Sequence, residues 1–287
     1  MTGSSRSGPG WAARIFTKER DLRMVWEVEH RRLRSVLVGT AHFFPYRFRT
    51  AIRRLIGGAD RVLLEGPLDD DARSKVVAAG STRRGASLHD ALDADTKLRI
   101  RALLAAPPAT ATASTFFWSV LHGYAPPAPD EDIRQLEPWM AFFHIWTEYR
   151  RRDGWVYSVD LDAAATAAAM TKYVRPLETI EEQIATLGRI PLNRIANFLR
   201  NVDWEIYRRA YVRHYLDGNL VALTAMARAF PSYCEPVIEE RDPVLVERMT
   251  PSLERGNAVA FVGIMHCRGL VAHLRARGFT VTGPPTS

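Results

Sequence analysis

Two Gly-x-x-His sequences lie near opposite ends of the 287-residue chain, and each follows a short apolar run. The first extends from Gly39 to His42 after the run 36–38, and the second extends from Gly263 to His266 after the run 259–262. Short apolar runs bounded by glycine predict buried strands, so each histidine is expected just beyond a strand end. We expect the two turns to meet in space and to form the working site of the protein.

A carboxylate follows the first of these turns by one helix. Glu65 ends the apolar run 61–64, which predicts another short strand. Two neutral imidazoles and a carboxylate can hold a divalent metal ion and leave one position open for water. We therefore predict His42, Glu65 and His266 as ligands of such an ion, with manganese, cobalt and zinc as candidates. The ion would lower the pKa of the bound water toward about 7 and so generate a nucleophile.

Two further residues are candidates for the site. Arg241 at its rim could stabilise an anionic transition state. Asp160 ends the predicted strand 157–160 and suits either the site itself or a supporting position beside it. The ordinary alternatives are an ion pair for Arg241 and a helix cap for Asp160.

The histidines and the glutamate also suit roles that involve no metal. A histidine after a strand can be a polar residue satisfied within the core, and Glu65 can be a surface carboxylate. Without a metal, His42 or His266 could act as a general base on an ester or lactone, because imidazole titrates near pH 6.5. A third hypothesis is a protein that binds haem or another small ligand without turnover.

The elements that must position these groups can be predicted from the surrounding pattern. The segments 24–28 and 35–38 predict a β-hairpin, the segment 46–56 a helix, and the segment 61–65 a strand. Strand, helix and strand in this order predict two parallel strands, which we expect to be neighbours. Ligands of such sheets bind beyond the carboxyl ends of the strands, which places His42 and Glu65 at one edge.

The second Gly-x-x-His turn is followed by a predicted helix, 268–277, and a strand, 279–281, with no acid that matches Glu65. The site should therefore be asymmetric, with His42 and Glu65 from the first half and His266 from the second. We predict an α/β fold with a central mixed β-sheet, built from two duplicated strand–Gly-x-x-His–helix halves. A large helical insertion, about 85–255, separates them. The expected organisation is a flexible lead-in 1–20, a single domain 21–283 and a tail 284–287.

Composition narrows the class of protein. The hydrophobic fraction of 47% and the charged fraction of 25% are typical of a soluble globular chain. The net charge is +7, but the basic residues are dispersed, so we expect no nucleic-acid partner. We expect no membrane span, because no run reaches about 18 apolar residues, and a cytoplasmic location, because the N-terminus lacks an export signal. The oligomeric state stays open.

Several landmarks occur in a characteristic order along the chain. They are Val25-Trp26, Gly39 to His42, Val62 to Glu65, Glu137-Pro138-Trp139, Val159-Asp160, Leu177 to Gln183, Arg241-Asp242 and Gly263 to His266. This set resembles the TraB/GumN family, which belongs with the Tiki proteases and the erythromycin-esterase-like and ChaN-like proteins. The resemblance covers 24–283. One departure is Arg241-Asp242, where many relatives have Arg-Asn.

The resemblance implies a mixed α/β fold with an active cleft at the strand ends. It also implies hydrolysis, which is metal-dependent in the Tiki branch and acts there on peptides. Other branches cleave a lactone ester or bind haem. The expected function is therefore a cytoplasmic metal-dependent hydrolase of a peptide or amide bond in a peptide or small-molecule substrate. The alternatives are a metal-independent esterase or lactone hydrolase and a non-catalytic binding protein.

Overall fold

The computed structural model describes residues 18–81, 85–105 and 133–286, so most of the expected lead-in 1–20 lies outside the described residues. The strands are β1 Val25–His30, β2 Leu33–Thr40, β3 Arg61–Leu64, β4 Tyr173–Pro176, β5 Ala258–Gly263 and β6 Thr280–Thr282. The first helices are α2 Arg49–Gly57, α3 Asp70–Gly80, α4 Leu88–Ala91, α5 Ala94–Ala105, α8 Pro138–Arg152, α9 Val159–Ala169 and α10 Ile180–Leu187. The later ones are α11 Leu192–Asn201, α12 Trp204–Asp217, α13 Leu220–Ala227, α14 Arg241–Leu253, the 3₁₀ helix η1 Ile264–His266 and α15 Cys267–Ala276.

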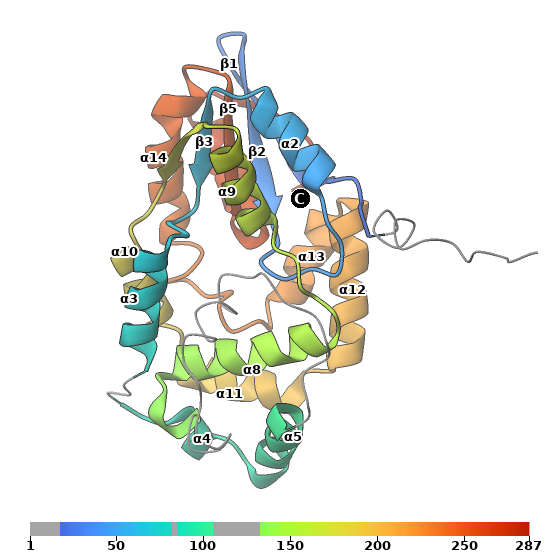
Figure 1. The fold of residues 1–287 in the computed structure, drawn as a ribbon, viewed down its shortest axis with the longest axis vertical. Helices are drawn as coiled ribbons and strands as arrows, with labels where there is room; N and C mark the ends of the chain where they lie inside the picture. The colour runs from blue at the N-terminus through green and yellow to red at the C-terminus, as the bar shows by residue number, and fades with distance from the viewer. Residues whose placement is uncertain (1–17, 82–84, 106–132, 287) are drawn as a thin grey trace, which may run out of the picture.

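A six-stranded mixed sheet of order β4-β3-β5-β2-β1-β6 forms one end of the molecule (Figure 1). The predicted hairpin is present, since β1 pairs antiparallel with β2 through the two-residue loop Arg31-Arg32. Both loop residues have positive φ, 49° and 67°, which is the turn geometry that matches the twist of paired strands. The strands β2, β5, β3 and β4 run parallel to one another, as the α/β expectation requires.

The expectation that β2 and β3 are neighbours is wrong. They are parallel, but β5 lies between them and pairs with both. All six residues of β5 are buried, whereas the hairpin strands carry several exposed side chains. A continuously apolar strand is stabilised most in the middle of a sheet that is covered on both faces. Consequently the two Gly-x-x-His turns leave adjacent strands, and Glu65 reaches the site from the far side of β5.

The predicted strand 157–160 is also wrong. Ser158 is the N-cap of α9, and its hydroxyl accepts the N–H of Leu161, so Asp160 lies in the first turn of a helix. Tyr157 makes only an isolated bridge with Phe44. The extended stretch is too short to form a strand, and the alanine-rich sequence that follows is a strong helix former.

Two apolar clusters fill the fold. One surrounds the sheet, and the other surrounds α8 and α11 at the opposite end. In Figure 1, α2 and α9 cover the near face of the sheet, while α14 lies behind it. The parallel strands end facing α8, so the strand ends and the helical part enclose a space between them. The insertion between the two halves is mostly helical, as predicted, and it also contributes β4 to the sheet.

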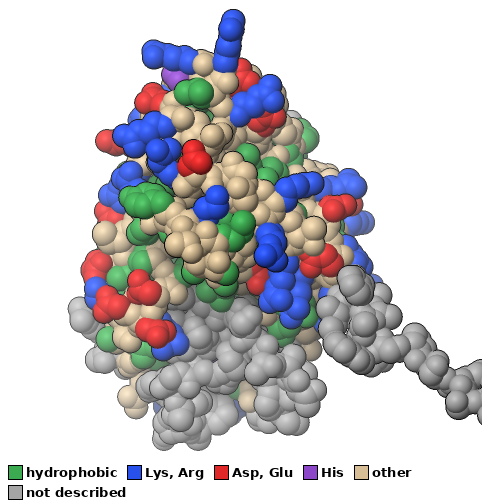
Figure 2. All heavy atoms as spheres, turned by 45° about the horizontal axis from the view of Figure 1, so that its top comes forward, with side chains coloured by type: hydrophobic (Ala, Val, Ile, Leu, Met, Phe, Trp, Pro, Cys, Tyr) green, Lys and Arg blue, Asp and Glu red, His purple; other side chains and the backbone are tan. Residues whose placement is uncertain are grey.

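The surface near the sheet carries both signs of charge. Figure 2 shows Lys and Arg side chains interspersed with Asp and Glu side chains on this face. Within residues 18–81, 85–105 and 133–286, no helix has the length and apolar content needed to cross a bilayer.

Candidate functional site

The two Gly-x-x-His turns interlock at the ends of β2 and β5. Gly39 lies opposite Val262 and Thr40 opposite Gly263 in the parallel register, so the two turns start within one residue of the same level. A Cβ on Gly39 would lie 2.3 Å from Cδ1 of Ile264, within the second turn. The glycine of the first turn therefore gives the second turn room to approach.

His42 forms a close pair with Asp160. Its Nδ1 lies 2.8 Å from Oδ2 of Asp160, and its side chain is 52% exposed while that of Asp160 is buried. Partial loss of solvent around this half-exposed ring disfavours the charged imidazole. The charge and hydrogen bond of Asp160 and the charge of Glu65 outweigh that effect and raise the pKa of His42 to about 9. His42 is therefore an imidazolium at neutral pH.

Glu65 is anchored on both oxygens. Oε2 accepts the backbone N–H of Gly263 at 2.7 Å, and Oε1 accepts from Nη2 of Arg241 at 2.6 Å. Desolvation opposes ionisation, yet Arg241, His266 and His42, together with the Gly263 N–H, hold the pKa of Glu65 well below its usual range. Glu65 is therefore a carboxylate across the whole physiological range.

Arg241 lies inside this cluster rather than at its rim, with a side chain that is 11% exposed. Its Nε and Nη2 donate to Glu178, and Nη2 also donates to Glu65. Its Nη1 contacts the carbonyl oxygen of Val237 at 3.3 Å and Nε2 of His266 at 3.1 Å. A guanidinium has five N–H donors, and these contacts use all of them. In this arrangement Arg241 orients its neighbours and has no donor left for a substrate.

His266 is held from both sides. Its Nδ1 lies 2.6 Å from Oδ1 of Asp242, a buried carboxylate at the start of α14. With Nδ1 donating to Asp242, Nε2 accepts from Arg241. Asp242 thus provides the same kind of acceptor oxygen that an asparagine at this position would provide.

The duplication extends to these acids. Asp160 is the second residue of α9 and Asp242 is the second residue of α14, and each contacts Nδ1 of one site histidine. A helix N-terminus stabilises a nearby negative charge, so both acids stand where a carboxylate is favoured. The sequence pattern points to Asp160 but not to Asp242 or Glu178 as site residues. The acid after Arg241 in the Arg241-Asp242 landmark is the signal that could have identified Asp242.

Gly269 on α15 allows Asp242 to reach His266. A Cβ at this position would lie 1.7 Å from Oδ2 and 2.7 Å from Cγ of Asp242. Gly269→Ala should therefore displace the carboxylate from His266 and lower the free energy of unfolding by about 1–3 kcal/mol, as overpacking does. Urea unfolding followed by circular dichroism measures the change.

Gly188→Ala is the matched control, because its Cβ would make only ordinary contacts at 3.5 and 3.6 Å from backbone in a helical conformation with φ of −62°. It should change stability by no more than about 0.5 kcal/mol. Equal stability of the two variants would contradict this role for Gly269.

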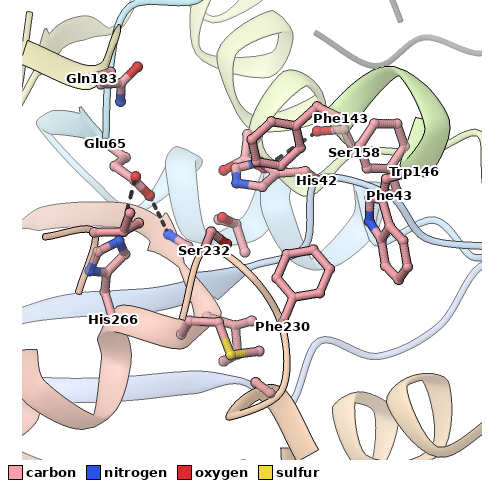
Figure 3. A pocket seen from close by; sticks show the side chains of 18 of the residues that line it. His42, Phe43, Glu65, Phe143, Trp146, Ser158, Gln183, Phe230, Ser232 and His266 are labelled. Carbon is pink, nitrogen blue, oxygen red and sulfur yellow. Dashed lines mark hydrogen bonds and ion pairs between the residues drawn. The ribbon is translucent and has the colours of Figure 1, made fainter. Parts of the chain in front are cut away.

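A cavity joins the polar cluster to an aromatic wall. Figure 3 shows Glu65 and His266 on one side of the pocket, Phe43, Phe143 and Trp146 on the other, and His42 between them. The space open to water-sized groups is about 230 Å³. Trp155, Tyr211 and Phe230 extend the wall, so the cavity accepts an apolar group beside the charged residues.

The predicted metal ligands are brought together around Gly263. A Cβ on Gly263 would lie 3.0 Å from Oε2 of Glu65, 3.6 Å from Cδ2 of His266 and 3.9 Å from Nε2 of His42. However, Oε1 of Glu65 and Nε2 of His266, two atoms that would coordinate the metal, both contact the guanidinium of Arg241. The positive charge of that guanidinium repels a second cation at the same place. The described part of the chain holds no group of three or more His, Cys, Asp or Glu side chains arranged to hold a metal ion. The residues as arranged do not fit a metal.

Similarity to known proteins is found at the level of a family. No curated protein and no solved structure matches the chain. A match to a protein family covers residues 24–283, which is the span of the landmarks and includes both histidine turns, Glu65, Asp160 and Arg241. The chain therefore belongs to the TraB/PrgY/gumN family.

Proposed function

We propose that this chain hydrolyses an ester or amide bond. The imidazolium of His42 donates a proton to the leaving group, and the carboxylate of Glu65 holds the attacking water and accepts its proton. The observation that carries the proposal is the placement of these two groups. Nε2 of His42 and Oε2 of Glu65 both lie within 4 Å of one point beside Gly263, and both residues line the cavity. The resemblance to hydrolytic branches of the family supports the reaction class.

His42 has the properties of a general acid. Asp160 on Nδ1 fixes the orientation of the ring and stabilises its charged form. With a pKa of about 9, the ring carries a proton at neutral pH and can donate it from Nε2 to a leaving oxygen or nitrogen. The same positive charge stabilises an oxyanion that develops on the scissile carbonyl.

Glu65 has the properties of a water-holding carboxylate. Arg241 and the N–H of Gly263 fix both oxygens, so the side chain loses little further freedom when it binds a water molecule. The environments push the two pKa values apart, upward for His42 and downward for Glu65, which is the pattern of a paired acid and base.

The apolar wall sets the expected substrate class. Aromatic side chains border the cavity next to His42, so an apolar group should flank the bond that is cleaved. Peptides with apolar side chains and small esters with apolar acyl groups both satisfy this requirement, and these are the compounds to screen.

A pH profile of kcat/KM on a substrate found in that screen tests the proposal. Because the acid must carry a proton, activity should fall about tenfold per pH unit above a pKa of about 9, with no acid limb from Glu65 near neutrality. Asp160→Asn removes the main group that raises this pKa, so the alkaline limb should move to lower pH. Asp162→Asn on the same helix should leave it in place. Activity that rises toward pH 9 would refute the acid role of His42.

Chelation separates this mechanism from the metal-dependent hydrolase with His42, Glu65 and His266 as ligands of manganese, cobalt or zinc. That mechanism would require Arg241 to leave Glu65 and His266. We expect activity to survive exhaustive chelation. Loss of activity on chelation, with recovery on addition of one of these ions, would support the metal-dependent mechanism instead.

A further inference from the structure

A further cation, Arg150, lines the aromatic side of the cavity. It lies near the end of α8 and is 3% exposed. Its guanidinium carbon lies 3.8 Å from the ring centre of Trp146 and 3.9 Å from that of Trp155. Tyr207 and Tyr211 of α12 surround it at 5.3 and 6.0 Å. Arg150 is therefore held between aromatic rings inside the molecule.

Arg150 has no carboxylate partner within the described residues. Burial lowers the pKa of Arg150 to about 10, which still leaves it charged at neutral pH. Burial also raises the pKa of Tyr207 to about 12, so that hydroxyl stays neutral and supplies no counter-charge. Asp153, an acid whose charge reaches Arg150, instead accepts a hydrogen bond from Arg208 at 2.8 Å. A buried charge without an ionic partner is costly, and proteins seldom keep one without a use.

The geometry limits what Arg150 can bind. The indole rings of Trp146 and Trp155 lie over the planar face of the guanidinium at stacking distance. Such rings stabilise its positive charge, but they accept no hydrogen bonds from the N–H groups along its edge. The edge matches a carboxylate, which accepts two parallel hydrogen bonds from a guanidinium. The apolar wall between Arg150 and His42 requires that the carboxylate be attached to an apolar body.

We propose that Arg150 binds the carboxylate of an apolar substrate or product. The substrate then lies with its carboxylate at Arg150, its apolar body along the aromatic wall, and its scissile bond at His42 and Glu65. This orientation rests on the proposed hydrolase function, but the recognition of the carboxylate does not. The free C-terminal carboxylate of an apolar peptide has the required chemistry. So does a separate carboxylate on the apolar part of an ester.

Isothermal titration calorimetry at pH 7 with 4-phenylbutyrate and its neutral amide, 4-phenylbutyramide, tests the proposal. The two probes share an apolar body and differ in charge. The wild type should bind the carboxylate about 10- to 100-fold more tightly, as expected for a charge-assisted pair. Arg150→Met keeps the apolar stem and should abolish the preference. Arg209→Met, an exposed position on α12, should retain it.

A second comparison distinguishes Arg150 from His42, which is also positively charged in the cavity. His42→Asn should retain the carboxylate preference if Arg150 is the binding group. No preference in the wild type, or a preference that survives Arg150→Met, would overturn the proposal. If Arg150→Met does not fold, Arg150→Lys takes its place and should weaken the preference, because lysine lacks the planar pair of donors. An unchanged preference in Arg150→Lys would then overturn the proposal. Since binding is measured without turnover, these outcomes are independent of whether the protein hydrolyses a bond.

Discussion

Arg241→Met is expected to lower the free energy of unfolding by about 3–5 kcal/mol, because it leaves Glu65 and Glu178 as buried carboxylates without their cation. Both acids are at most 14% exposed, so bulk solvent screens their charges only weakly once the guanidinium is gone. The same change frees Oε1 of Glu65 from Arg241, so the carboxylate that holds the attacking water loses its fixed orientation. Activity should therefore be lost even in molecules that remain folded. Urea unfolding monitored by circular dichroism measures the change in the free energy of unfolding.

Arg189→Met is the matched control for this prediction. Arg189 forms a two-point ion pair with Glu240 of similar geometry, but the side chains are 54% and 44% exposed. Solvent screens such pairs, so the loss should stay below about 1 kcal/mol. In the Arg241→Met background, Glu178→Gln should restore part of the lost stability by removing one unpaired charge. Equal effects of the two arginine substitutions would contradict the role assigned to the buried cluster.

His42→Asn is expected to reduce kcat/KM by about 10²- to 10⁴-fold while leaving the fold intact. The asparagine amide nitrogen can take the place of Nδ1 and keep the hydrogen bond to Asp160, whereas the position of Nε2 is lost. The substitution therefore removes the proposed proton donor without leaving Asp160 unpaired.

Steady-state kinetics at pH 7 on the screened substrate measures this effect, and thermal unfolding checks the fold. His273→Asn replaces an exposed histidine near the end of α15 and should leave the rate unchanged. Full activity of His42→Asn would remove His42 from the mechanism and leave Glu65 and His266 to be tested in turn.

Local patterns predict much of the sheet. The hairpin, β3, β5 and β6 follow from short apolar runs and their glycines, because runs of this length bounded by turn residues are typical of buried strands. The Thr179-Ile180-Glu181-Glu182 sequence is a local helix-start signal, and it forms a capping box at the start of α10. These features depend only on residues that are close together in the sequence, so they can be predicted without knowing the tertiary contacts.

The pattern fails where long-range packing decides. It places β3 beside β2, but β5 takes the central position because it is buried on both sides. It makes 157–160 a strand, but the Ser158 cap and the alanines after it favour a helix. No local signal shows that β5 will lie between β2 and β3, because strand pairing depends on the burial of segments far apart in the chain.

The sequence by itself determined that His42, Glu65 and His266 follow strands or turns that can share one edge, because carboxyl ends of parallel strands meet there. Only the tertiary structure decided what surrounds them. Arg241 and Glu65 are 176 residues apart, and their contact exists because α14 packs against β5. That packing places a guanidinium against Glu65 and His266, two of the predicted metal ligands, and brings Asp242 to His266. The start of α9 separately brings Asp160 to His42. The types of the reacting groups come from local sequence, whereas their charges and partners come from contacts that only the folded chain makes.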